Sequence, residues 1–283
     1  MQEKLASVLS KKLLEVGIEG DVSNLEPLTG GASKEIWKFE VSNTRESIKM
    51  ILRRGSGIEG PLAIKTADEA RIQKEVIKVG APVPIILAVS KKEEELGDAY
   101  IMHFVEGESI ARKILRDKEY KKALPILAHQ CGEAIAKIHN VDINNFSFLP
   151  KKPAEDQLED LYSTYQSFEQ PSPVFEYAYL WLKEQDFGNF QESLVHGDFR
   201  LGNIIVNADG LQSIIDWELA HIGNPLQDLG WVCGNSWRFG KNDKVVGGFG
   251  ELEDLLEGYN SISKLKVNKE MVRCWQVFGI FRW

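Results

Sequence analysis

The sequence of 283 residues has few cysteines, no long apolar run and no excess of positive charge. Its three cysteines, Cys131, Cys233 and Cys274, lie far apart, so neither a disulfide framework nor a zinc-binding spacing can be drawn from them, and we expect a reducing compartment. No segment approaches the roughly 18 apolar residues that a membrane-spanning helix needs. The N-terminal stretch MQEKLASVLSKKLLEVG is charged throughout and has no signal-peptide core. These absences predict a cytoplasmic protein without a membrane segment.

The charge balance is acidic, with a formal net charge of -8. A basic face for nucleic acid is therefore not expected. The chain is long for a single hydrophobic core, which predicts one large domain or two lobes. Nothing in the sequence indicates the oligomeric state.

The first part of the sequence alternates strand-like runs with turns. Residues 3–16 carry leucines at helical spacing and precede Gly17, a typical helix-ending residue, so we expect a helix there. Residues 67–79 predict a second helix, closed by Gly80 and the APVP breaker. Residues 1–106 are thus expected to form a first lobe with a five-stranded antiparallel sheet plus a helix. The predicted strands lie in VSNLEPLT, EIWKFEV, SIKMILRR, PIILAVS and AYIMHFV.

The remainder, residues 107–283, is predicted to be a mainly helical lobe, which makes the protein α+β. An apolar stripe over residues 124–138 predicts a long buried helix. The exception is a small β-hairpin, with NIIV and QSIID around the turn NADG. The final VRCWQVFGIFRW ends in mid-pattern without a cap, so either the chain is cut at Trp283 or more helix follows. Further helices are expected at residues 174–183, 225–234, 251–259 and 268–283.

Three polar residues surround that hairpin in LVHGDFRLGNIIVNADGLQSIIDWELA. Asp198 could accept a proton from a hydroxyl, while Asn203 and Asp216 offer the hard oxygen ligands that Mg²⁺ prefers. An Asp base, a nearby Asn and an Asp after one hairpin form the arrangement that phosphoryl transfer uses. Each residue alone would be an ordinary loop or strand-end residue. Their joint spacing predicts the chemistry.

These motifs resemble the aminoglycoside phosphotransferase-like kinases, a family with the bilobal protein-kinase-like fold. The residues of the segments HGDFRLGNIIV and VFGIFRW look closest to the branch associated with acyl-CoA dehydrogenases. HGDFRLGN resembles the family's catalytic loop, which implies that Asp198 is the base and Asn203 a metal ligand. IDWE is similar to its metal-binding segment and implies that Asp216 binds Mg²⁺. Arg200 stands where the family has a basic group that contacts the transferred phosphate, and so is counted as catalytic.

Two further segments resemble structural parts of the family. GNPLQDLGW is similar to the element after the metal-binding segment, which implies that Asp228 braces the catalytic loop. AKIHNVD resembles the helix end before that loop, so His139 is expected to be structural. The seven tryptophans are expected to serve packing rather than ligand stacking.

The resemblance also assigns the nucleotide-binding residues of the first lobe. Backbone N–H groups at Gly30, Gly31 and Ser33 would cover the nucleotide phosphates. YIMHFVEG looks like the linker between the lobes. Met102 would line the adenine pocket there. The backbones of His103 and Val105 would bond the base.

The family further needs a cation on the third strand, paired with a helix carboxylate. Lys49 and Arg53 both qualify, because residues four apart in a strand share a face. The ILRR match favours Arg53, although most kinases have a lysine, and an arginine can hold phosphate oxygens bidentately. Glu69 is favoured over Glu75 as the partner because of its spacing before the APVP segment.

One motif points to a different class of protein. GSGIEG, residues 55–60, is a literal G-x-G-x-x-G, which alone would predict an NAD-binding oxidoreductase. Pro61 interrupts the expected helix start, and the acidic cluster at residues 93–95 comes too late for the ribose contact. We interpret the segment as a loop.

The resemblance therefore implies a small-molecule kinase that uses ATP or GTP with Mg²⁺ to phosphorylate a substrate hydroxyl. Its branch implies a hydroxyacyl or other metabolite as acceptor, with an aminoglycoside, choline or amino-alcohol as the alternative. A catalytically silent pseudokinase is disfavoured because Asp198, Asn203 and Asp216 are all present.

Overall fold

The computed structural model describes residues 2–28, 34–57, 60, 63–188 and 190–283. The chain divides into two compact units. Unit 1 comprises Met1–Lys78 and Val83–Val105, and unit 2 comprises Val79–Pro82 and Glu106–Trp283.

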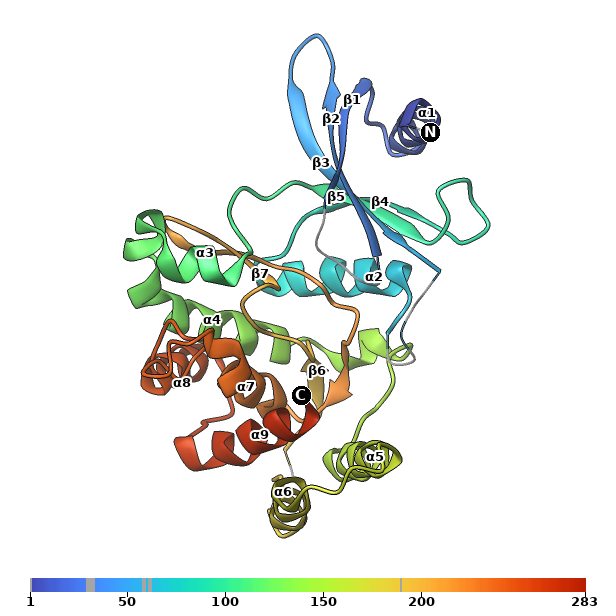
Figure 1. The fold of residues 1–283 in the computed structure, drawn as a ribbon. Coiled ribbons are helices and arrows are strands. Elements are labelled where there is room, and N and C mark those ends of the chain that lie inside the picture. The colour runs from blue at the N-terminus through green and yellow to red at the C-terminus, as the bar shows by residue number, and fades with distance from the viewer. Residues whose placement is uncertain (1, 29–33, 58–59, 61–62, 189) are drawn as a thin grey trace. The chain divides into compact units, whose positions relative to one another are not determined.

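Unit 1 is built on a five-stranded antiparallel sheet with the strand order β1-β2-β3-β5-β4 (Figure 1). The first three strands form the predicted meander and the last two the predicted hairpin, with β5 paired to β3. The α+β fold class with a five-stranded first sheet is confirmed. The strands are β1 (Asp21–Leu28), β2 (Lys34–Ser42), β3 (Ser47–Gly55), β4 (Ile86–Ser90) and β5 (Ala99–His103).

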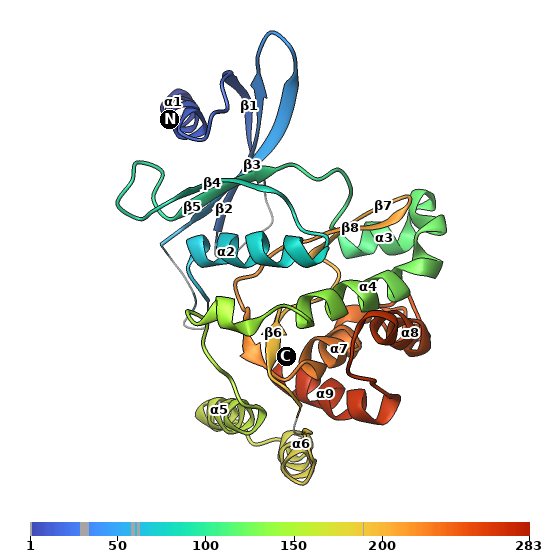
Figure 2. The same cartoon turned by 180° about the vertical axis from the view of Figure 1, so that it is seen from behind.

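Alternation along β3 sends side chains to two different helices of unit 1. Met50 and Leu52 are fully buried in a core that includes α1 (Gln2–Leu14). Arg53 points to the other face, where it contacts α2 (Thr66–Val76). Because successive strand residues face opposite sides, the two helices cover opposite faces of the sheet (Figure 2).

Unit 2 is centred on α4 (Leu124–His139), which packs closely on α8 (Leu252–Ile262). A Cβ atom at Gly132 of α4 would lie 2.1 Å from the carbonyl oxygen of Leu255, so only glycine lets the two backbones approach this closely. The other helices of unit 2 are α3 (Ala111–Arg116), α5 (Ala154–Ser167), α6 (Pro173–Lys183), α7 (Leu226–Val232) and α9 (Lys269–Arg282).

Two small two-stranded sheets complete unit 2. The predicted hairpin is present as β7 (Ile204–Asn207) and β8 (Gly210–Ile214). A second antiparallel pair, β6 (Ser193–Val195) with β9 (His221–Gly223), was not predicted. Three residues are too few to show an alternating pattern, so this pair depends on its tertiary surroundings.

The GSGIEG segment begins with Gly55, the last residue of β3, which belongs to an antiparallel sheet. Ile58 and Glu59 of the segment lie outside the described residues, and α2 begins only at Thr66. A dinucleotide fingerprint needs a parallel βαβ unit in which the helix starts at the glycine loop. The antiparallel pairing of β3 therefore argues against a dinucleotide site, in agreement with the interpretation of the segment as a loop.

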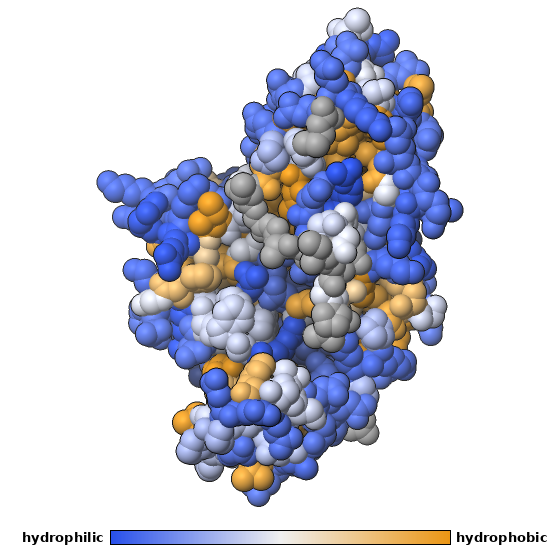
Figure 3. Space-filling model, turned by 45° about the vertical axis from the view of Figure 1, so that its right-hand side comes forward, coloured by the Kyte–Doolittle hydropathy of each residue, from blue (hydrophilic) through white to orange (hydrophobic). Residues whose placement is uncertain are grey.

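Hydrophilic side chains cover most of the face shown in Figure 3, with apolar patches between them. Exposed apolar side chains also occur on α6, including Val174, Tyr177 and Leu180. All three cysteines are buried and free. Within the described ranges, every helix is too short or too polar to cross a bilayer.

Candidate active site

The centre of the site is the loop between β6 and β7, which begins with His196, Gly197 and Asp198. Gly197 has φ +82°, and a Cβ atom there would lie 2.5 Å from the carbonyl oxygen of Leu219. A glycine is therefore required for the turn that presents Asp198.

Asp228 of α7 holds the backbone of this loop. Its carboxylate accepts hydrogen bonds from the N–H groups of His196 (2.8 Å) and Gly197 (2.9 Å), and it lies 3.2 Å from Nε2 of His139. Asp228 is fully buried. Burial works to raise the pKa of its carboxyl, but the hydrogen bonds from the His139 side chain and from the His196 N–H outweigh burial and hold that pKa below its usual value. Asp228 and His139 thus stand where the predicted brace and structural histidine would be.

The carboxylate of Asp198 is fixed from several sides. Its Oδ1 atom accepts hydrogen bonds from Nε of Arg200 (3.0 Å) and from Nε1 of Trp231 (2.8 Å). Its Oδ2 atom accepts one from Nδ2 of Asn203 (2.6 Å), which also donates to the Asp198 carbonyl oxygen. The structure therefore brings together three residues that the sequence selected.

Asp216, the second predicted metal ligand, lies two residues after the end of β8. That strand pairs with β7, which begins directly after Asn203. The N–H of Ile215 donates to the carbonyl oxygen of Asn203 at 2.9 Å, which keeps the two segments together. Asp216 has φ +68°, a left-handed conformation that costs energy for a residue with a Cβ. Such strain clusters at functional sites.

His196 joins the base to the Asp216 segment. Its Nδ1 atom lies 3.2 Å from the N–H of Asp198, and its Nε2 atom lies 3.1 Å from the carbonyl oxygen of Ile215. The first contact needs an acceptor and the second a donor, so the geometry fits the tautomer with its proton on Nε2. The described oxygen set, the Asn203 amide and the Asp216 carboxylate, has the chemistry that Mg²⁺ prefers.

In unit 1, Arg53 of β3 donates a hydrogen bond to Glu69 of α2 at 2.9 Å, and their side chains are 7% and 0% exposed. The first N–H groups of α2 donate to the carboxylate of Asp98, which fixes the helix start. Lys34 of β2 adds a second buried cation, with its Nζ atom 3.6 Å from Oε1 of Glu69. Two cations, Arg53 and Lys34, thus meet one carboxylate, Glu69, in the interior of unit 1.

The two alternatives to this pair lie elsewhere. Lys49 is exposed, with its Nζ atom 5.7 Å from the centre of the Phe104 ring. Glu75 forms an ion pair of 2.6 Å with Lys78 on the surface. The geometry is consistent with Arg53 and Glu69 as the paired residues, and their roles toward a nucleotide stay predictions.

The predicted base-binding residues lie on β5 and just after it. Met102 is half-buried and pairs with Ile51 of β3. His103 donates its N–H to the carbonyl oxygen of Ile85, so a contact of its backbone with a base would use the His103 carbonyl. Val105 is the last residue of unit 1. The predicted phosphate-covering residues lie outside the described part of the chain: Gly30, Gly31 and Ser33.

Sequence reasoning missed three residues of these clusters. Trp231 was expected only to pack, although it follows Asp228 by three residues and so shares its helix face. Arg282 of α9 donates to the carbonyl oxygen of Gly197 at 3.0 Å. Neither Arg282 nor Lys34 carried a local signal, because both contacts depend on tertiary packing.

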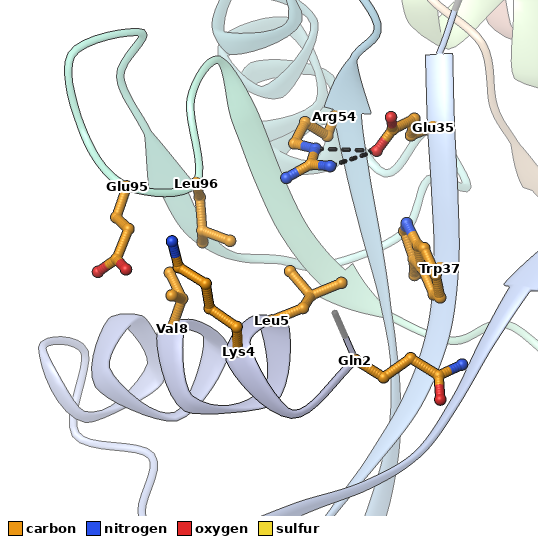
Figure 4. A pocket seen from close by; sticks show the side chains of 9 residues that line it. All are labelled: Gln2, Lys4, Leu5, Val8, Glu35, Trp37, Arg54, Glu95 and Leu96. Carbon is orange, nitrogen blue, oxygen red and sulfur yellow. Dashed lines mark hydrogen bonds and ion pairs between the residues drawn. The ribbon is translucent and has the colours of Figure 1, made fainter.

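A hollow on unit 1 lies between α1 and the sheet (Figure 4). Lys4 and Leu5 line it from α1, and Trp37 lines it from β2. Two charged residues that line the hollow, Arg54 and Glu35, are paired with each other, because Arg54 donates to the Glu35 carboxylate at 3.0 Å. We assign no ligand to this hollow.

The chain is similar to known proteins in sequence and in fold. A family model described as "Phosphotransferase enzyme family" matches residues 24–264. The chain is similar to acyl-CoA dehydrogenase family member 10 of Mus musculus, with 27% identity over 199 residues that cover 65% of this chain and 18% of the relative. It is also similar to acyl-CoA dehydrogenase family member 11 of Rattus norvegicus, with 31% identity over 183 residues, 60% of this chain and 23% of the relative. The matched part spans about a fifth of the length of these relatives, and the predicted resemblance to this branch is confirmed.

Solved structures show the same fold. The GDP and kanamycin complex of APH(2")-IIia has a TM-score of 0.65 at 14% identity and covers 96% of this chain and 88% of that one. The AMP-bound complex of spectinomycin phosphotransferase APH(9)-Ia has a TM-score of 0.65 at 15% identity, with coverage of 99% and 86%. At such identities the likeness concerns the fold alone, and the predicted protein-kinase-like fold is confirmed.

Proposed function

The chain belongs to the phosphotransferase enzyme family, and we propose that it is a small-molecule kinase that transfers the γ-phosphate of ATP or GTP to a substrate hydroxyl. The observation that carries this proposal is the set of contacts around Asp198. A carboxylate held by Arg200 and Asn203, with the strained Asp216 after the same hairpin, is a residue set of the kind that phosphoryl transfer uses.

In the proposed reaction, the acceptor hydroxyl gives its proton to Asp198 while its oxygen bonds to the γ-phosphorus. The bond from that phosphorus to the oxygen bridging to the β-phosphate breaks, which leaves ADP or GDP. Arg200 would balance charge on the transferred group. Bound Mg²⁺ would supply charge neutralisation, and Asn203 and Asp216 would hold it. Catalysis of this kind rests on positioning and oriented charge.

We assign nucleotide binding to residues 1–106 and acceptor binding with catalysis to residues 107–283. Arg53, held by Glu69, would contact phosphate oxygens, and the backbones of His103 and Val105 would bond the base. Solved structures with this fold include an ATP ternary complex and a GDP complex, which supports a nucleoside triphosphate as donor. The remaining proposed contacts to the nucleotide come from Met102 and from the backbones of Gly30, Gly31 and Ser33.

For the acceptor we propose a hydroxyl on an acyl group or a related metabolite. The support is similarity to proteins named as acyl-CoA dehydrogenase family members, with identities of 27% and 31%. The antibiotic phosphotransferases share only the fold, at 14% and 15% identity. Aminoglycosides and choline-like alcohols are therefore the comparison substrates in an acceptor panel.

The experiment is thermal unfolding with Mg-ATP, Mg-GTP, Mg²⁺ alone and NAD. A ligand that binds the native state stabilises it by about 2.7 kcal/mol at 100 times its dissociation constant. We expect an upward shift of the midpoint with a triphosphate and Mg²⁺, which Asp216→Asn abolishes. Asp209→Asn is the matched control, because Asp209 is exposed in the turn of the same hairpin. A shift with NAD alone, or none with either triphosphate, would refute the proposal.

A further inference from the structure

The indole of Trp231 donates a hydrogen bond of 2.8 Å to Oδ1 of Asp198. Trp231 lies on α7 and is 5% exposed, whereas Asp198 lies in the loop after β6. An indole N–H is a donor only, so this contact has a fixed direction.

Burial alone does not give a tryptophan such a partner in this protein. Trp217 and Trp275 are 0% and 1% exposed, and among the described residues their Nε1 atoms have no hydrogen-bond partner. Both sit in unit 2, as Trp231 does. The contact of Trp231 is thus specific to its position beside the loop.

The ring of Trp231 is clamped from α9. The guanidinium of Arg282 lies 4.6 Å from its ring centre while also donating to the carbonyl oxygen of Gly197. A Cβ atom at Gly279 would lie 3.1 Å from Cε3 of Trp231, so glycine leaves room for the indole. The ring of Trp237 packs against the same indole at 5.2 Å. The donor is therefore held in place by α9 as well as by its own helix.

We propose that Trp231 is a positioning residue that fixes the carboxylate of Asp198 for proton transfer, an inference that rests on the proposed kinase function. With Trp231 and Arg200 both bonded to Oδ1, the oxygen that meets the acceptor hydroxyl is Oδ2. Among the described residues Oδ2 has one protein donor, Asn203, and a carboxylate oxygen accepts two. Trp231 contributes by preventing rotation of the carboxylate away from this arrangement.

The test is Trp231→Phe, with Trp275→Phe as the matched control. Both changes remove a buried indole of unit 2, but only the first removes a donor to Asp198. For Trp231→Phe we expect kcat to fall between about 10-fold and 100-fold, the range for a hydrogen bond to a charged group, with KM for the nucleotide unchanged. Trp275→Phe should change neither quantity.

A second variant guards against disturbed packing. Replacing Trp231 by benzothienylalanine keeps the ring size and removes the N–H, so it should reproduce the lower kcat with an unchanged KM for the nucleotide. A wild-type kcat in this variant would overturn the proposal.

An NMR readout separates this inference from the proposed function. In the full chain, the indole N–H resonance of Trp231 should shift on Asp198→Ala while that of Trp275 stays in place. If the wild-type protein transfers no phosphate but this resonance shifts, the kinase proposal fails and the contact stands. If the resonance does not shift, the positioning role fails whatever the activity.

Discussion

Arg53 donates a hydrogen bond of 2.9 Å to Glu69 in the interior of unit 1 and so links β3 to α2. Lys34 lies 3.6 Å from the same carboxylate. A buried ion pair is weak evidence for stability by itself, but removal of one partner leaves a buried charge without compensation. This cluster should therefore be sensitive to loss of its carboxylate.

The substitution Glu69→Ala is expected to lower the free energy of unfolding by about 3–5 kcal/mol, because two buried cations lose their counter-charge. Denaturant unfolding measures the loss. Glu75→Ala, on the surface of the same helix, is the control and should cost no more than about 1 kcal/mol. Equal losses in the two variants would show that Glu69 does not hold the cations.

Arg53→Gln should weaken binding of Mg-ATP by about 10-fold to 100-fold, since a charged donor to phosphate is lost. Lys49→Gln removes the other candidate cation of the same strand face and should change the affinity much less. Titration calorimetry gives both dissociation constants. The opposite ranking would assign the phosphate contact to Lys49.

Asp228→Asn should destabilise the protein by about 2–3 kcal/mol at pH 7, because the N–H groups of His196 and Gly197 donate to different carboxylate oxygens and an amide places its NH2 donor against one of them. The pKa of Asp228 lies below its usual value, so its stabilisation is present above about pH 4 and is lost as the pH falls through the folded-state pKa. The difference between wild type and variant should accordingly shrink in acid. If the difference in free energy of unfolding between the two proteins stayed constant from pH 7 into strong acid, the stabilising role of the ionised Asp228 carboxylate would be contradicted.

Burial of His221 lowers its pKa to about 4, so the unfolded chain takes up a proton at higher pH than the folded protein does. The contribution of uncharged His221 to the free energy of unfolding is fully present above about pH 6.5, its pKa in the unfolded chain. The free energy of unfolding falls by up to about 3 kcal/mol as the pH drops toward 4. His221→Gln should flatten this part of the stability profile. Ile222→Val, on the same strand, should leave the slope as in wild type, and a slope retained in His221→Gln would show that another group is responsible.

Much of the fold could be predicted from local patterns. The apolar stripe of α4 and the turn between β7 and β8 are contained in short stretches of sequence, and both elements were expected where they occur. The β6–β9 pair and the helices α3 and α5 were not expected. The 14 residues of α5 bury only Ala154, Leu158 and Tyr165, so its apolar stripe is weak. Elements of three and six residues carry too little periodicity, and their stability comes from packing.

The candidate site likewise contains some residues that local sequence spacing identifies and others that only tertiary packing brings in. Asp198, Asn203 and Asp216 could be selected because the hairpin fixes their spacing along the chain. The Trp231 contact joins residues 33 positions apart and depends on how α7 packs beside the loop. Lys34 joins the Arg53–Glu69 pair through strand register and helix packing, which no local motif records.

The most direct test of the account is phosphate transfer from labelled ATP or GTP to hydroxyacyl-CoA thioesters with the hydroxyl at successive carbons, with kanamycin and choline as comparison acceptors. The account predicts transfer by the wild-type protein with Mg²⁺ and a loss of about 100-fold to 10,000-fold in Asp198→Asn, which keeps the side-chain shape but lacks the base. Transfer by Asp198→Asn at the wild-type rate would contradict it.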